Sequence, residues 1–220
     1  MMDNKIEFIG TITASVTHEL KNVLSIIKES AGLMEDLIAL APENSMPHKD
    51  KFVRSISRIA DQVARGVELS SRLNSFAHTS DEPRARVDLN QAVEQAVFLS
   101  QRFARLRGAE LKNTKSEKQH QVTTDPLGLQ MLLFSSIGLL MAEAAPGAAI
   151  TLQVEGEGSD SIVLLKSTPQ PGAISEFKDL AETTEWQVLR ETAHALDADV
   201  SEDRSRAGIS VSFSGSEKRI

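Results

Sequence analysis

The chain of 220 residues has no cysteine, which excludes disulfide bonds and thiolate metal sites. Its five histidines are scattered along the sequence instead of standing at the spacing of metal ligands. We therefore expect no structural metal site in the chain.

The chain also lacks an excess of basic residues and a long apolar run near its start. The 24 lysines and arginines are outnumbered by 31 aspartates and glutamates, which gives a formal net charge of −7. No basic face is indicated, so a nucleic-acid partner is not expected. No apolar stretch of signal-peptide or membrane-span length follows Met1–Lys5. The expectation is a cytoplasmic protein without membrane association.

The first forty residues carry a seven-residue apolar repeat. One row of the repeat runs from Ile6 to Ala41, and a second row comprises Ile9, Val16, Val23, Ser30 and Leu37. Further apolar residues beside these rows widen the stripe beyond the seam of a two-stranded coiled coil. The pattern predicts a long helix over 6–41 that packs in a four-helix bundle and ends near Pro42.

A second helical repeat runs from Phe52 to Leu73 and ends before a linker at 81–87. Two long helices joined by a short loop form an antiparallel hairpin, here predicted over 1–80. The apolar stripe of such a hairpin needs a partner, and an identical hairpin from a homodimer supplies one.

The sequence from 88 to 220 predicts a separate domain. Asp88 is a candidate N-cap for a helix that ends near Arg107, and further helices are expected at 125–145 and about 176–196. Strands are expected at 148–155, 161–166, 198–202 and 209–213. The predicted fold class is α+β: a two-helix hairpin forming a dimeric four-helix bundle, followed by an α/β sandwich with helices on one side of its sheet.

His18, Glu19 and Asn22 are the candidate functional residues. Because Leu20 belongs to the apolar row, His18 is predicted to point away from the bundle axis. Steps of one and four residues turn about 100° and 40° around a helix, so all three side chains are expected on one exposed face. One ring nitrogen of a neutral imidazole can act as a nucleophile while Glu19 accepts the proton of the other. The alternative is an ordinary solvated helix face. The remaining histidines, His48, His78, His120 and His194, are predicted to be surface or capping residues.

The segment Ser15–Leu24 resembles the H-box of histidine kinases, in which a phospho-accepting His is followed by an acidic residue and, four positions later, by Thr or Asn. The resemblance implies that His18 is the phospho-acceptor, that Glu19 is the acid/base group that orients the imidazole, and that Asn22 orients a hydrolytic water. It also implies a dimerisation and phosphotransfer hairpin. Val23 stands where many members carry a proline.

The resemblance extends to the family's ATP-binding domain through Val87–Val93 and Asp125–Leu133, and then fails. Members carry two asparagines that hold magnesium and phosphates, and we place those positions at Phe134 and Gly138. The turn that binds adenine is replaced by Ser167–Gly172, and the segment Leu180–Trp186 has no glycine. The prediction is a degenerate domain that does not use ATP.

The resulting prediction is a histidine phosphotransfer protein of two-component signalling. His18 is expected to exchange phosphoryl groups with the aspartate of a response-regulator receiver domain, and the receiver supplies the magnesium. Two alternatives stay open. One is a module that binds a receiver and dephosphorylates or regulates it, and the other is a sensor histidine kinase with a divergent ATP site.

Overall fold

The computed structural model describes residues 2–41, 48–145, 147–157, 160–169, 180, 183–203 and 207–214. The chain forms two compact units. One comprises Ile6–His78, and the other comprises Thr79–Ile220 together with Met1–Lys5.

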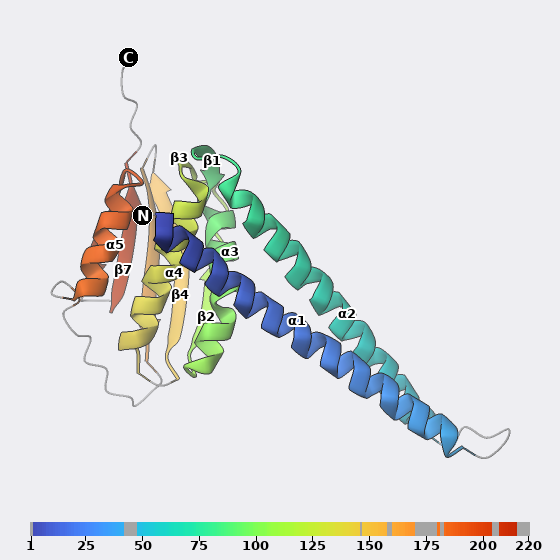
Figure 1. Cartoon of the computed structure of the whole chain (residues 1–220). Helices are drawn as coiled ribbons and strands as arrows, with labels where there is room; N and C mark the ends of the chain where they lie inside the picture. The colour runs from blue at the N-terminus through green and yellow to red at the C-terminus, as the bar shows by residue number, and fades with distance from the viewer. Residues whose placement is uncertain are drawn as a thin grey trace. The chain divides into compact units, whose positions relative to one another are not determined.

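The first unit is a hairpin of two long helices, α1 (Met2–Ala39) and α2 (Lys49–Ala77) (Figure 1). The two helices run antiparallel. Near one end, the rings of Phe8 and Phe76 meet edge to face with centroids 5.6 Å apart, and further along, Glu19 pairs with Arg65. Both predicted helices are confirmed, and residues 42–47, where the sequence predicts the loop between them, lie outside the described residues.

The two predicted apolar rows of α1 differ in their burial. Val16, Val23, Ser30 and Leu37 of the second row are buried. By contrast, Leu20 and Ile27 of the first row are only partly covered, and large apolar side chains elsewhere on the hairpin are about half exposed, among them Leu24, Ile56 and Val63. The hairpin therefore covers one part of its apolar surface and leaves another part open.

The second unit is an α/β sandwich. Its main sheet has five strands in the order β2-β4-β5-β7-β6, and a separate antiparallel pair joins β1 (Ala85–Asp88) to β3 (Gln121–Thr124). The main strands are β2 (Glu110–Thr114), β4 (Ala149–Glu157), β5 (Asp160–Thr168), β6 (Ala198–Asp203) and β7 (Gly208–Phe213). Strand β2 pairs parallel with β4 and the other pairs are antiparallel, so the sheet is mixed.

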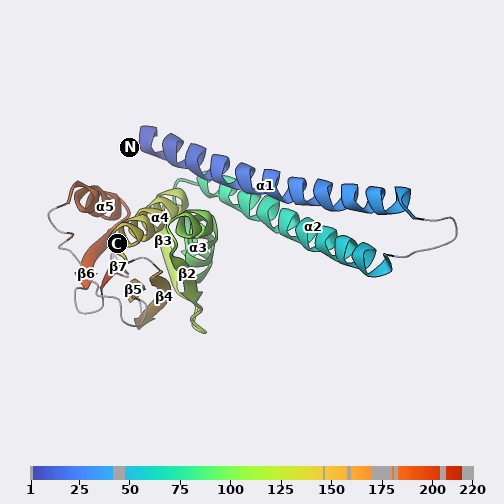
Figure 2. The same cartoon turned by 90° about the horizontal axis from the view of Figure 1, so that it is seen from below.

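Three helices cover one face of this sheet (Figure 2): α3 (Leu89–Leu106), α4 (Pro126–Glu143) and α5 (Thr184–His194). Burial alternates along β5, where Val163 and Leu165 are buried in the core and Ile162 and Leu164 are only partly buried. The predicted fold class of helices packed on one side of a mixed sheet is confirmed.

Side-chain caps fix where the helices of this unit begin. The Asp88 carboxylate accepts from the backbone N–H of Asn90, and the Asp125 carboxylate accepts from that of Gly128, as the sequence predicts for these two starts. The last helix begins later than predicted. Thr183 Oγ1 accepts from the N–H of Trp186, which sets the start of α5 at Thr184 instead of near 176. Residues 176–179 of the predicted helix lie outside the described residues.

Three strands were not predicted from the sequence. Strand β1 begins inside the predicted linker 81–87, and β2 and β3 lie in a polar stretch that has no clear alternation of apolar residues. They form because they pair with strands distant in sequence: β2 with β4 and β1 with β3. A short polar segment can therefore form a strand through this pairing even where its own residue pattern does not indicate one.

One described helix, α4, is long and apolar enough to cross a membrane by length and composition. It is apolar all round because it lies at the centre of the sandwich. Leu129, Leu132, Leu133, Ile137 and Leu140 are fully buried there, so the core accounts for its composition.

Candidate functional site

The site is centred on His18, in the middle of α1. His18 is exposed, whereas Val16 two residues earlier is 5% exposed and Val23 five residues later is 3% exposed. The heptad pattern that turns these valines toward α2 leaves His18 on the outer side of the helix. An imidazole in this position can be reached by a partner protein.

Asn22 stands one helical turn after His18 and contacts its ring. Asn22 Nδ2 lies 3.4 Å from His18 Nδ1, as expected for residues four apart on a helix. Among the described residues, no hydrogen bond occupies the other ring nitrogen, Nε2. If the Asn22 amide presents its oxygen, it accepts the Nδ1 proton and leaves the Nε2 lone pair available.

The sequence predicts that Glu19 shares an exposed face with His18 and Asn22, and the structure places its side chain differently. Its side chain is only 13% exposed, and its Oε2 accepts from Arg65 Nη2 of α2 at 3.1 Å. The carboxylate is therefore directed toward α2, whereas His18 and Asn22 are exposed. Arg65 was not among the candidate residues that the sequence indicated. An ordinary arginine in the polar part of a helical repeat gives no signal until the antiparallel register of the hairpin is known.

A close approach of the two helices lies beside the site. A Cβ built on Gly66 would stand 3.3 Å from Val23 Cγ1, so the absence of a side chain at 66 lets α2 lie near α1 here. Arg65 is the neighbouring residue. The Gly66 contact thus brings its guanidinium within reach of Glu19.

The second unit has no amide ligand at the two positions where the resemblance predicts the family's magnesium-binding asparagines. At the positions predicted to replace the family's asparagines, Phe134 packs edge to face on Phe103 with centroids 5.3 Å apart, and Gly138 has no side chain. Helix α4 as a whole contains no Asn or Asp. Magnesium is bound through oxygen ligands, and neither predicted position offers a side-chain oxygen, so we derive no chemical step through ATP.

The described residues of the segment before α5 are packed into the core instead of forming an open loop. Leu180 is fully buried in the core, and its carbonyl accepts from both the N–H and the Oγ1 of Thr183. Trp186 is 4% exposed in the same core cluster. These residues anchor the segment to the sandwich. The replacement of the adenine turn at Ser167–Gly172 falls partly on residues outside the description.

The other histidines take up the predicted surface and capping positions, with one exception. His48 and His78 flank α2 at its two ends, and His194 is exposed in the last turn of α5. The prediction is wrong for His120, which is 6% exposed and lies with Nε2 3.2 Å from Ser116 Oγ. The ring lies against Gly156 of β4, where an added Cβ would stand 3.2 Å from His120 Nδ1. The described residues contain no group of three or more His, Asp or Glu side chains that could hold a metal.

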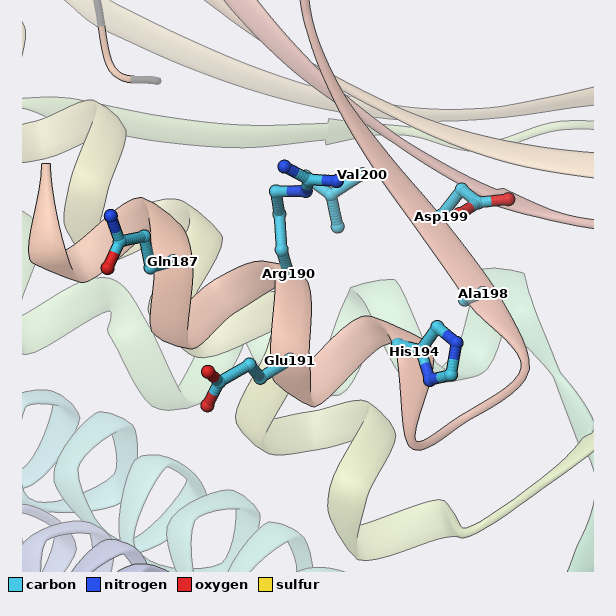
Figure 3. A pocket seen from close by; sticks show the side chains of 7 residues that line it. All are labelled: Gln187, Arg190, Glu191, His194, Ala198, Asp199 and Val200. Atoms are coloured by element: carbon cyan, nitrogen blue, oxygen red, sulfur yellow. The ribbon is translucent and has the colours of Figure 1, made fainter. Parts of the chain in front are cut away.

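A shallow pocket of about 480 Å³ lies between α5 and the edge strand β6 (Figure 3). Arg190 extends from α5 toward Val200, and His194 lies near Ala198. The lining mixes Arg190 and His194 with Glu191 and Asp199, so it does not favour a ligand of one charge. This pocket lies in the second unit, and the chemistry at His18 does not use it.

Comparisons with known proteins relate the chain to histidine kinases, although no family model matches it. The sensor histidine kinase ZraS of Salmonella typhi is 27% identical over 161 residues, and that of Salmonella typhimurium is 26% identical over the same length. These matches cover 73% of this chain and 33% of each relative. The chain thus matches about a third of the length of the curated relatives.

Solved histidine kinases also align with the chain. The Acinetobacter baumannii kinase AdeS shares 15% identity over 91% of this chain and 98% of that chain, with a TM-score of 0.47. The kinase ThkA, solved in complex with the response regulator TrrA, shares 16% identity over 99% of this chain and 65% of that chain, also with a TM-score of 0.47. By its sequence, the chain is similar to part of the sensor histidine kinase ZraS.

Proposed function

We propose that this protein is a histidine phosphotransfer protein of two-component signalling. In this proposal His18 accepts a phosphoryl group from the aspartyl phosphate of a response-regulator receiver domain and can return it to such an aspartate. The receiver provides the magnesium ion. The site in this chain supplies the nucleophile and its orientation.

The observation that carries the proposal is the environment of His18. The ring is exposed at mid-helix, Asn22 lies against Nδ1, and Nε2 is available for reaction. A core histidine would lack this exposure. The second unit supports the same function, because Phe134 and Gly138 stand at the positions predicted for the magnesium-binding asparagines and α4 contains no Asn or Asp.

The proposed step forms a bond between His18 Nε2 and phosphorus and breaks the bond between phosphorus and the aspartate oxygen. The electron pair of the broken bond leaves on the aspartate, which becomes a carboxylate stabilised by the receiver's magnesium. As positive charge develops on the imidazole, the Nδ1 proton is held by Asn22 Oδ1 or passes to Glu19. Return of the phosphoryl group reverses each of these changes.

The functional form in this proposal is a homodimer. The hairpin leaves Leu24, Ile56 and Val63 at 64%, 55% and 49% exposure, together with further apolar side chains on both helices. An exposed apolar surface of this kind on paired helices is unfavourable in water. A second copy of the hairpin presents the same surface and completes a four-helix bundle. A cytoplasmic location and the absence of a nucleic-acid partner belong to the same proposal.

The direct experiment is transfer of label from a panel of ³²P-phosphorylated receiver domains to the purified protein. The proposal expects label on the protein that is lost in acid and retained in base, as for phosphohistidine. Failure of every receiver to donate, with the protein folded, would contradict it.

A sensor histidine kinase with a divergent ATP site is the second candidate, favoured by the similarity to ZraS. If this candidate is correct, ATP should label His18 in the absence of a receiver. A receiver phosphatase is favoured by Asn22, whose amide lies beside the imidazole and could orient a water. If the protein is a receiver phosphatase, the receiver should lose its phosphate and no label should appear on His18.

A further inference from the structure

We propose that the groove between α5 and β6 binds an extended peptide that adds as a further strand to the edge of the main sheet. The peptide carries an acidic residue that faces Arg190 and, next to it, a basic residue that faces Asp199. The groove lies in the second unit, so the inference does not rest on the chemistry at His18.

Strand β6 lies at an edge of the main sheet. It comes last in the strand order and, in the described part of the chain, pairs with β7 alone. In an antiparallel pair, alternate residues direct their N–H and C=O groups away from the partner strand. At least one of Ala198, Asp199 and Val200, which line the groove, therefore directs both groups away from β7. An extended peptide can pair with such groups.

The opposite edge of the sheet is arranged differently. Strand β2 ends the sheet on that side, and the carbonyl of Leu111 accepts from Gln101 Nε2 of α3 at 3.0 Å. A side chain of the same unit thus occupies a main-chain acceptor of β2. Among the described residues, no side chain bonds in this way to the main chain of Ala198 or Val200. The edge at β6 is therefore the better site for an added strand.

The charged side chains of the groove lie on two sides of β6. Ala198 is buried and Val200 partly buried on the side that packs toward the core, whereas Asp199 between them is exposed on the other side. From α5, Arg190 extends toward Val200, and the Glu191 carboxylate points away from β6 (Figure 3). In the described part of the chain, neither Arg190 nor Asp199 has an ion-pair partner.

This separation of charge matches the geometry of a strand. Neighbouring residues of an extended peptide point to opposite sides. An acidic residue on the α5 side pairs with Arg190, and the basic residue beside it then lies on the side of Asp199. The mixed charge of the groove, which does not suit a single ion, is thus complementary to a peptide with adjacent acidic and basic residues.

The test uses the full chain and a fluorescein-labelled synthetic peptide of sequence TVEKVT, measured by fluorescence anisotropy. We expect saturable binding with a dissociation constant below about 1 mM. Arg190→Glu should weaken binding by about two- to tenfold, because an exposed ion pair becomes a like-charge contact. The peptide TVKKVT should bind this variant better than it binds wild type. Arg86→Glu is the matched control and should leave the affinity unchanged, because Arg86 is exposed in the same unit and does not line the groove.

Main-chain pairing is tested separately with two N-methylated forms of TVEKVT, methylated at the odd or at the even residues. Only alternate residues of the peptide direct their N–H groups toward β6, so one form should bind at least about tenfold more weakly than the other. Amide hydrogen exchange at Ala198–Val200 should slow when the unmodified peptide is bound.

Three results overturn the inference: no saturable binding up to about 1 mM peptide, equal affinities of the two methylated forms, or an unchanged affinity in folded Arg190→Glu. Slower exchange at Ala198–Val200 with rising protein concentration and no peptide would assign the edge to a second copy of the chain and would also overturn it. None of these measurements involves a receiver or His18, so their failure leaves the proposed function standing.

Discussion

Asn22 Nδ2 lies 3.4 Å from His18 Nδ1, one turn along the exposed side of α1. This contact distinguishes the two ring nitrogens. Nδ1 has a neighbour that can donate or accept, depending on how the Asn22 amide is turned, and Nε2 is the nitrogen available to a phosphoryl donor. Asn22 therefore influences which tautomer of His18 is present.

Replacing Asn22 by Ala should affect hydrolysis of the receiver's phosphate but not uptake of the phosphoryl group by His18. The alanine cannot orient a water, so dephosphorylation of a bound receiver should fall by about 10²-fold or more if that activity exists. Uptake of phosphoryl by His18 should persist, because the nucleophile is retained. Release of inorganic phosphate and label on His18 are measured in the same reaction. Equal loss of both would contradict separate roles for these two residues.

Replacing Ile56 by Asp should dissociate the dimer without unfolding the hairpin. Ile56 is 55% exposed in the single chain, so the new carboxylate remains in water there, whereas pairing of two hairpins would bury it. Sedimentation velocity at micromolar concentration should show a dimer for wild type and a monomer for the variant. Val188→Asp is the control, since Val188 is 48% exposed on α5 of the other unit and should leave the dimer intact. A monomeric wild-type protein would contradict the dimer proposal.

Replacing Gly66 by Leu should destabilise the hairpin by about 1–3 kcal/mol, because the side chain enters the space in which Val23 packs. The matched control is Gly32→Leu, since a Cβ at Gly32 meets no atom within 4 Å. The control should be neutral or slightly stabilising, because leucine favours a helix more than glycine does. Thermal unfolding followed by circular dichroism compares the two, and equal stability would argue against the close approach at Gly66.

The full chain should not bind ATP with a magnesium-dependent dissociation constant below about 100 μM, which corresponds to roughly −5.5 kcal/mol. The reason is that α4 supplies no Asn or Asp and Phe134 is engaged with Phe103. Isothermal titration calorimetry with and without magnesium is the measurement. Tighter, magnesium-dependent binding would favour the sensor-kinase candidate.

Sequence periodicity predicted much of the fold. The heptads of α1 and α2, the Asp88 cap and the helical pattern at 125–145 are local signals, and they located four of the five described α-helices well. Strands β1, β2 and β3 were missed because their positions depend on pairing with segments distant in sequence. The late start of α5 was missed because Thr183 was not recognised as its cap.

The candidate site was predictable only within one helix. Residues four apart on a helix face each other, so the His18–Asn22 contact follows from the sequence. The position of the Glu19 side chain does not follow from the sequence, because its carboxylate pairs with Arg65, which is 46 residues away in the chain. The register of two antiparallel helices decides that pair, and no local pattern specifies it.

Phosphoryl uptake by His18→Gln tests the central claim most directly. Glutamine keeps a polar side chain at an exposed helical position, so folding and dimerisation should match wild type. Wild-type and variant proteins are incubated with the same ³²P-phosphorylated receiver, and label that is stable in base and lost in acid is counted. The account predicts label on wild type and none on the variant. Equal labelling of His18→Gln would place the nucleophile elsewhere and contradict the account.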